Sequence, residues 1–547
     1  MKKRVVASVL AAVMGLSTSI YADETTENVV PKNWDDPYEE TVTITIGGLG
    51  NSQDMNLPDG DTLEDNEFTR RIKERFNIDV KVEWMATDEA ALSQKVSLAL
   101  TSGDMPDIMM VPNQILLSQL VESDLVADLD EAYEEGMSPY NKAVLDTYGS
   151  RKFDTCTFDG KLKAISNYVP GYSYAFTWLR KDWLDKLGLE EPSTMDDLEN
   201  IIDAFVTQDP DGNGKDDTIG LLCDQRVGGI YNSNHSMDPI FGYYGSYPRQ
   251  WLKKEDGSVT YGTIEPETKE ALQKLRDMYA AGLIDEEFAV RNPNDINAPL
   301  SSDECGVMFG PWWAPYTLQD SVNNDQEADW QPYLCPLDEN DKFKVYQQEI
   351  HTDWAVVNKD CEHPEAIFKI WSMLTEYLQP IENLPKDFSY PYRGTSADGK
   401  TIIPLKLQIS EQDYMPKEYQ ALNEAEETKN KDILSEVMVP VYEARLEYKE
   451  DPVANRDKWA GFMARTGGYE VASRDNVVVA DNCVFFAMTD SMVARWTSLE
   501  KMENEMMLAI ITGEKDIDYF DEFVKQWKSL GGDEIMEEAA QIVAEQN

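Results

Sequence analysis

The chain has 547 residues, enough for about two to four domains, and 42% of them are hydrophobic. Asp and Glu number 102 against 49 Lys and Arg, which gives a formal net charge of −53. Because this charge would repel nucleic-acid phosphates, the composition argues against a nucleic-acid-binding protein. We expect a strongly negative and very soluble surface.

The first 22 residues have the pattern of an export signal. Lys2, Lys3 and Arg4 precede an apolar stretch over residues 5–16, and Ala22 offers a cleavage point before an acidic linker at 23–40. The apolar stretch is too short for a membrane span, although an uncleaved N-terminal anchor helix is the alternative. We expect export.

Strand and helix patterns alternate between residues 41 and 129. Strands are predicted at 41–50, 78–86, 106–112 and 125–129, with an amphipathic helix at 66–77 and further helices at 88–103 and 113–124. In the first helix Phe68, Ile72 and Phe76 recur at intervals of four, and Gly103 ends the second. This β-α-β-α-β order predicts a mostly parallel α/β sheet.

The second half of the chain is less regular. An aromatic-rich stretch at 165–188 precedes a helix that Ser193 or Thr194 caps, and a strand is predicted at 218–224. Further helices are predicted at 266–281, 363–377 and 497–511, and two more flank Gly531 and Gly532. The polar stretch at 379–455 is expected to be an insertion with some helix.

The loop "DPDGNGKDDTIG" at 209–220 resembles a calcium loop. Oxygen donors at alternate positions can converge on one hard cation, and a glycine at position 6 permits the sharp turn. The candidate ligands are Asp209, Asp211, Asn213, the Lys215 carbonyl and Asp217. Gly220 stands where an EF-hand has a bidentate Glu, so Asp217 is the expected bidentate ligand. A turn without metal, rich in Asx residues, is the alternative.

Catalytic residues cannot be named from the sequence. Three histidines are present, and GxSxG, HExxH and P-loop patterns are absent from the sequence. The six cysteines (156, 223, 305, 335, 361 and 483) form no CxxC motif, so a zinc site is not expected, and both disulfides and free thiols stay open. Glycoside hydrolases need only two catalytic carboxylates, and among 102 acidic residues no such pair can be singled out, so the sequence leaves a glycoside hydrolase possible.

Several aromatic and polar residues are candidate ligand contacts; Trp84 lies at the end of a predicted strand, and the loop at 51–54 follows another. Trp312 and Trp313 lie between two prolines in "GPWWAPYTL", a rigid platform on which sugar rings could stack. The residues proposed to contact ligand are Trp312, Trp313, Trp84, Tyr172, Asn51 and Gln53. Hydrophobic core is the alternative for the aromatics, and a solvent-exposed turn is the alternative for residues 51–54.

Several stretches together resemble the extracellular solute-binding proteins of ABC importers, in the LipO-like oligosaccharide-binding group. The chain is similar to alginate-oligosaccharide-binding proteins in particular. The most specific match is "RKDWLDKLGL" followed by "TQDPDGNGKDDTI"; "SGDMPDI", "GPWW" and "TDWAVVNKDCEHPEAIFKIWSML" follow the order of the family. The resemblance covers about residues 41–540.

The resemblance implies an α/β fold of two lobes, the type II-like fold of periplasmic binding proteins, with hinge strands between the lobes and extra C-terminal helices. The expected N-terminal lobe covers residues 41–167 and 346–378, and the C-terminal lobe covers 168–345 with the calcium loop. Residues 379–547 would complete both lobes. The resemblance also implies a structural calcium ion, although Thr218 replaces a further carboxylate of the family.

We therefore predict a non-enzymatic, monomeric substrate-binding component of an ABC importer. It would capture a carbohydrate outside the membrane and deliver it to the permease subunits. A secreted glycoside hydrolase and a binder of peptide or lipid-linked solute are the alternatives. Because the first cysteine is Cys156, lipid attachment at a lipobox is not expected.

Overall fold

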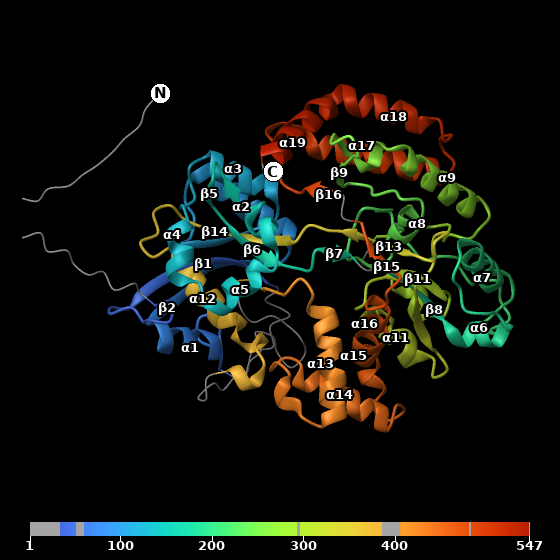
Figure 1. Cartoon of the computed structure of the whole chain (residues 1–547), viewed down its shortest axis with the longest axis horizontal. Helices are drawn as coiled ribbons and strands as arrows, with labels where there is room; N and C mark the ends of the chain where they lie inside the picture. Colours follow the sequence, from blue (N-terminus) through green and yellow to red (C-terminus); the bar gives the residue numbers. More distant parts are fainter. Residues whose placement is uncertain are drawn as a thin grey trace, which may run out of the picture.

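A computed structural model describes residues 33–50, 60–173, 175–292, 296–384, 405, 407–480 and 483–545. Two lobes with separate hydrophobic cores lie side by side, and crossing segments of chain join them (Figure 1). The core of the N-terminal lobe draws on residues 42–168, 350–374 and 405–409, whereas the main core of the C-terminal lobe draws on 179–346 and 485–543. Each lobe is thus built from segments distant in sequence.

The N-terminal lobe contains a five-stranded sheet in the order β2-β1-β3-β14-β6. Its strands are β1 (Val42–Leu49), β2 (Ile78–Ala86), β3 (Ile108–Val111), β6 (Ile165–Tyr168) and β14 (His351–Val357). β1 pairs in parallel with β2 and β3, which confirms the predicted parallel unit, and β14 pairs antiparallel with β3 and β6. The carboxyl ends of β1, β2 and β3 therefore share one edge of the sheet.

The helices predicted between these strands are confirmed, and each begins at a side-chain cap. They are α1 (Glu67–Phe76), α2 (Glu89–Ser102) and α3 (Gln114–Glu122), capped by Asn66, Asp88 and Asn113. Gly103 ends α2 with φ of 73°, a left-handed conformation that glycine adopts without strain. The strand predicted at 125–129 is wrong, because only a single bridge, between Val126 and Asn358, forms there.

Three further helices belong to the N-terminal lobe: α4 (Asp130–Gly136), α5 (Pro139–Asp146) and α12 (Ala366–Thr375). α12 is buried along its whole length, which explains its almost continuous apolar sequence. Its backbone passes so close to α4 that a Cβ on Gly136 would lie 2.5 Å from the Glu365 carbonyl oxygen. A glycine is therefore required at this crossing.

The C-terminal lobe is organised around the antiparallel sheet β11-β8-β12. Its strands are β8 (Phe176–Arg180), β11 (Val307–Gly310) and β12 (Trp330–Tyr333). The helices are α6 (Lys181–Leu187), α7 (Met195–Thr207), α8 (Asp238–Tyr243), α9 (Pro266–Ala280), α10 (Ala298–Ser301) and α11 (Pro315–Asn324). Thr194 caps α7 in a capping box with Asp197, and the helix predicted at 266–281 is confirmed. The strand predicted at 218–224 is wrong, since isolated bridges alone form at Ile219, Leu221 and Leu222.

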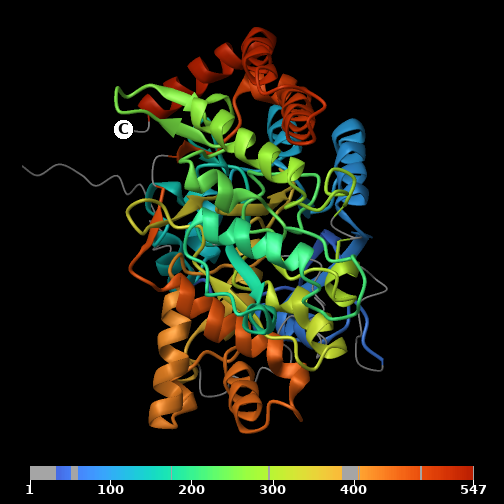
Figure 2. The same cartoon turned by 90° about the vertical axis from the view of Figure 1, so that its right-hand side faces the viewer.

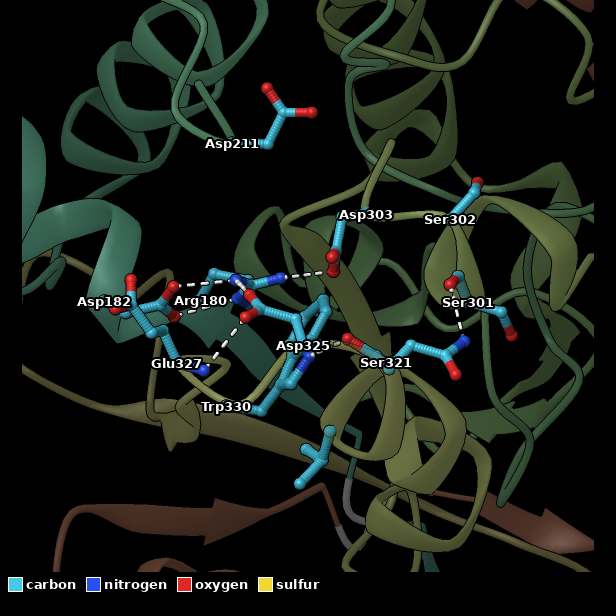
Figure 3. Close-up of polar contacts among 12 residues, drawn as sticks. Arg180, Asp182, Asp211, Ser301, Ser302, Asp303, Ser321, Asp325, Glu327 and Trp330 are labelled. Atoms are coloured by element: carbon cyan, nitrogen blue, oxygen red, sulfur yellow. Dashed lines mark hydrogen bonds and ion pairs between the residues drawn. The ribbon is translucent and has the colours of Figure 1, made fainter. Parts of the chain in front are cut away.

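Arg180, which is buried, lies at the end of β8 and at the centre of a charge network with three half-buried carboxylates (Figure 3). Its guanidinium lies 2.7 Å from carboxylate oxygens of both Asp182 and Asp303, and 2.6 Å from Asp325. Asp303 precedes β11 and Asp325 ends α11, so one cation joins three parts of the lobe. Asp211 lies apart from this network in Figure 3.

The C-terminal end of the chain covers one side of the C-terminal lobe with α17 (Asp490–Ile511), α18 (Tyr519–Trp527) and α19 (Asp533–Glu545) (Figures 1 and 2). α17 starts earlier than the predicted 497 because Thr489 caps it. Gly531, at φ of 122°, and Gly532 separate the last two helices, as predicted. None of the helices in the described residues combines the length and apolarity that a membrane span requires.

A further group of helices lies at the bottom of Figure 1, and two of them, at residues 459–463 and 469–472, pack into cores of the C-terminal lobe. The group consists of α13 (Tyr414–Thr428), α14 (Val439–Glu450), α15 (Trp459–Met463) and α16 (Tyr469–Ala472), and a π-helical turn at Ala464–Gly468 joins the last two. α13 and α14 form a small core of their own, which confirms helix within the polar stretch at 379–455. All six cysteines are free thiols, and five of them are buried.

Candidate functional site

The lobes are connected by two strands that pair with each other and by a third segment. β7 (Tyr172–Ser173) pairs antiparallel with β13 (Phe343–Gln347), so the outgoing and returning chains lie side by side. On its other side β13 pairs in parallel with β15 (Val477–Val479), which makes a three-stranded sheet in the order β15-β13-β7. The third segment, at 407–413, leaves the N-terminal lobe and enters α13; the Tyr168 amide donates to the Gln408 carbonyl at 2.9 Å. A two-lobed body with crossing strands can close around a ligand by bending at these strands.

An aromatic cluster lies beside this crossing. The Trp312 ring centroid is 4.9 Å from that of Tyr469 and 6.3 Å from that of Tyr414. Trp312 follows β11, whereas Tyr414 starts α13 and Tyr469 starts α16. Gly468 makes this packing possible, because a Cβ there would lie 2.9 Å from the Trp312 carbonyl oxygen.

One basic and one acidic side chain complete the cluster. The Arg465 guanidinium carbon lies 5.3 Å from the Trp312 ring centroid, and Glu418 accepts a 2.8 Å hydrogen bond from the Tyr469 hydroxyl. Burial raises the pKa of Glu418. Burial by itself would lower the pKa of Arg465, but neighbouring groups including Tyr316 and Glu418 raise it, so the guanidinium stays charged. The buried Arg465 Nε has no hydrogen-bond partner. Tyr469 is itself fully buried. Trp312 and Tyr414, which are half-buried, are therefore the rings on which a polyhydroxylated ligand can stack, with Arg465 as a donor and Glu418 as an acceptor.

The other candidate ligand contacts are distributed over both lobes. Trp313 is half-buried and donates from Nε1 to Asn232 at 3.1 Å. Tyr172 accepts a 3.0 Å hydrogen bond from Gln412, two residues before Tyr414, so the third crossing segment lies between Tyr172 and the aromatic cluster. Trp84 lies at the carboxyl end of β2, in the N-terminal lobe.

Trp84 packs against the sheet. A Cβ on Gly47 of β1 would lie 2.3 Å from its ring, so the glycine is needed to accept the indole, and the Lys95 ammonium lies 5.6 Å from the ring centroid. Asn51 and Gln53, the other two predicted contacts, lie outside the described residues.

Sequence reasoning missed Tyr414, Glu418, Arg465 and Tyr469, although each borders Trp312 or its partner Tyr469. They lie about 100 to 160 residues away from Trp312 in the sequence. The one local signal is the glycine pair in "ARTGGYE", which forms the π-helical turn that carries Arg465. Such turns occur often at functional sites.

A network of buried polar side chains lies where the returning hinge segment enters the N-terminal lobe. His351, the first residue of β14, lies 2.7 Å from the Ser166 hydroxyl through Nδ1 and 2.8 Å from Asp154 Oδ1 through Nε2. Burial raises the pKa of the adjacent Glu349 to about 7. Burial alone would lower the pKa of His351, but Cys156 and Asp154 raise it above its ordinary value. Ser166, His351 and Asp154 have the residue types of a catalytic triad. Ser166 is fully buried, so a substrate has no access to its hydroxyl group.

The loop at 209–217 brings its predicted ligands together. Asn213 donates to Asp211 at 2.5 Å and to Asp217 at 3.0 Å, and the Gly214 amide donates to Asp209 at 3.1 Å. Gly212 and Gly214 both have φ of 75°, which bends the loop around these side chains. The buried Asp209 Oδ1 has no hydrogen-bond partner. Three converging carboxylates with one orphaned oxygen fit a hard divalent cation.

Comparisons with known proteins agree with this architecture. The sequence matches the family described as "Bacterial extracellular solute-binding protein" over residues 59–378. It is 23% identical over 488 residues, 86% of each chain, to the polygalacturonan/rhamnogalacturonan-binding protein YtcQ of Bacillus subtilis (strain 168). It is 21% identical over 472 residues to the lipoprotein LipO of the same organism, covering 84% of this chain and 85% of LipO.

Solved structures share the fold. The alginate-binding protein AlgQ2, solved without calcium ion, superposes with a TM-score of 0.60 at 17% identity, over 94% of this chain and 100% of AlgQ2. The two-lobed α/β fold predicted from the sequence is therefore confirmed. Since the family match spans more than half of the chain, this protein belongs to the bacterial extracellular solute-binding protein family.

Proposed function

We propose that the protein captures a carbohydrate, an oligosaccharide, between its lobes and delivers it to the membrane subunits of an ABC importer. The aromatic cluster of Trp312, Tyr414 and Tyr469 carries this proposal, since it lies beside the hinge strands and is flanked by Arg465 and Glu418. The names of YtcQ and AlgQ2 as polygalacturonan- and alginate-binding proteins support the ligand class. Trp84, Trp313, Tyr172, Asn51 and Gln53 are proposed as further contacts.

Binding would work by trapping. A ligand that contacts both lobes is held more tightly in the closed arrangement than in the open one, so it raises the population of the closed form. The permease would recognise that closed form. The exported chain would act outside the membrane, as the family description and the pattern of the first 22 residues suggest.

Calcium is proposed as a structural ion at the loop 209–217. Asp209, Asp211, Asn213, the Lys215 carbonyl and Asp217 would hold it, and the ion would neutralise carboxylates that otherwise repel one another. The loop is in the C-terminal lobe after α7, apart from the aromatic cluster in sequence and in contacts among the described residues. Removing calcium should therefore lower stability more than affinity.

A glycan titration tests the proposal. Intrinsic tryptophan fluorescence and calorimetry would be followed while oligogalacturonates, alginate oligosaccharides and fructo-oligosaccharides are added separately. We expect saturable binding of at least one glycan, and no release of reducing ends over hours. Glycan turnover would support the glycoside-hydrolase alternative, and saturable binding of peptides without glycan binding would refute the carbohydrate assignment.

A further inference from the structure

Phe486 belongs to the C-terminal lobe by its backbone. It follows β16 (Cys483–Phe485), which pairs antiparallel with β9 (Trp251–Lys253), and β9 pairs with β10 (Val259–Tyr261). Figure 1 shows this sheet under α17 and α19, in the C-terminal lobe. The position of Phe486 is therefore fixed by that lobe.

Its contacts reach the N-terminal lobe. The Gln114 side-chain amide donates to the Phe486 carbonyl at 3.1 Å, and the Arg151 guanidinium carbon lies 3.9 Å from the centre of the Phe486 ring. Gln114 is the first residue of α3, and Arg151 lies in a 3₁₀ turn at Gly149–Phe153 that follows α5. A guanidinium at this distance over a ring makes a cation–π contact.

Arg151 is held in place independently of Phe486. Its Nη2 donates to the Gln348 carbonyl at 3.1 Å, on the crossing segment between β13 and β14, and its Nε lies 3.7 Å from Asp154. Asp154 in turn accepts from His351. The Phe486 ring thus contacts the Arg151 guanidinium, which is held in place by the N-terminal lobe and by the hinge segment.

The location of Gln114 shows how the contact depends on the separation of the lobes. Gln114 comes three residues after β3, at the edge where the carboxyl ends of β1, β2 and β3 meet. In open α/β sheets ligands bind outside this edge. Phe486 belongs to the opposite lobe and contacts this edge through Gln114, so it bridges the two lobes. Opening the lobes would therefore move Phe486 away from Gln114.

We propose that Phe486 is a latch that favours the closed arrangement of the lobes, and that it sets ligand affinity without contacting the ligand. It acts through Arg151 and Gln114. A cation–π contact and one hydrogen bond together change the ratio of closed to open protein on the order of tenfold. Affinity falls by up to the same factor, because a ligand must then shift a more open population. The affinity part of this proposal rests on the proposed function, whereas the lobe separation does not.

The test measures lobe separation without any ligand. Spin labels are attached in the Cys361→Ser background to Leu98→Cys on α2 and Val290→Cys in the C-terminal lobe, two positions that are 63% and 76% exposed. Electron–electron double resonance then gives the interlobe distance distribution. We expect Phe486→Ala to add or enlarge a longer-distance population, and Gln114→Ala to do so to a smaller extent.

The matched control is Phe158→Ala, which removes a half-buried phenyl ring from within the N-terminal lobe. It should leave the distance distribution unchanged. Thermal unfolding checks that each variant is folded, and Phe486→Leu, which retains bulk but not the cation–π contact, replaces Phe486→Ala if that variant does not fold.

The affinity of each variant for oligosaccharides is measured by the same fluorescence titration that tests the proposed function. Wild-type distances in both Phe486→Ala and Gln114→Ala would overturn the latch, even if affinity fell, because that pattern indicates direct ligand contact. A shifted distance distribution in a protein that binds none of the glycans would leave the latch standing and refute the carbohydrate proposal instead.

Discussion

Calcium binding at the loop 209–217 can be tested by replacing one ligand. Asp217→Asn removes a carboxylate that accepts from Asn213 at 3.0 Å and lies 3.5 Å from the Lys215 ammonium, while it preserves side-chain size. Wild-type protein should be stabilised by calcium and the variant should not. The comparison isolates the ion, because both proteins can make the same hydrogen bonds within the turn.

The expected size of the effect follows from mass action. If the dissociation constant is about 10⁻⁵ M, 1 mM calcium is about 100-fold in excess and adds about 2.7 kcal/mol to the folded state. About 1 kcal/mol moves the melting temperature of a domain of roughly 150–250 residues by about 2–4 °C, so a shift of about 5–10 °C is expected for the lobe that holds the loop. Three carboxylates within one loop, with an orphaned Asp209 oxygen, are the structural basis of this expectation.

Differential scanning fluorimetry in 1 mM calcium and in EDTA measures the shift. Asp216→Asn is the matched control, since it makes the same charge change at an exposed neighbour outside the proposed ligand set. A calcium site at this loop is refuted if wild-type protein melts at the same temperature in both buffers, or if Asp216→Asn abolishes the calcium effect as completely as Asp217→Asn. Loss of glycan binding in EDTA at unchanged melting temperature would contradict the structural role.

Three further predictions concern the candidate ligand contact Trp313, the carboxyl group of Glu349 beside the hinge, and the charge network around Arg180. Trp313→Ala should weaken glycan binding about two- to tenfold by loss of one stacking face, measured by calorimetry. The control is Trp34→Ala, which removes a partly buried indole that packs against the core of the N-terminal lobe; an equal loss of affinity in this variant would contradict a direct contact by Trp313. Burial raises the pKa of Glu349 to about 7, so the folded state binds an extra proton between about pH 4.5 and 7 and stability from this group falls as pH rises through that window. Glu349→Gln should therefore flatten the dependence of melting temperature on pH between 5 and 7.5, and an unchanged slope would exclude this carboxyl as its source. Arg180→Ala leaves three carboxylates without their cation and should cost about 3–5 kcal/mol of unfolding free energy, measured with urea; a loss below about 1 kcal/mol would show that the network contributes little.

The local structure was largely predictable from the sequence, because local interactions decide it. Asn66 and Thr194 cap helices by bonding to amides within three residues, and Gly103 ends a helix by its own backbone freedom. The calcium-like loop is a continuous stretch whose spacing brings its ligands together, so the residues around Asp211 could be named in advance. The parallel β-α-β unit follows from the same alternation.

The two wrong strands show where local reasoning ends. Residues 125–129 and 218–224 have the apolar composition of strands, yet each forms only isolated bridges, such as Val126 with Asn358 and Leu221 with Ile284. A strand needs a neighbour that continues alongside it, and the presence of that neighbour depends on segments more than 60 residues away.

The sequence by itself determined the α/β class, the ends of α1 and α2, the candidate loop and the Trp312–Trp313 pair. Only the tertiary structure decided which side chains stand around Trp312, and which residues of one lobe reach the other. Tyr414, Arg465 and Tyr469 meet Trp312, and Phe486 meets Arg151, through contacts between residues more than 100 positions apart. No periodicity encodes such contacts, because they arise when separately formed elements bury their apolar faces against one another.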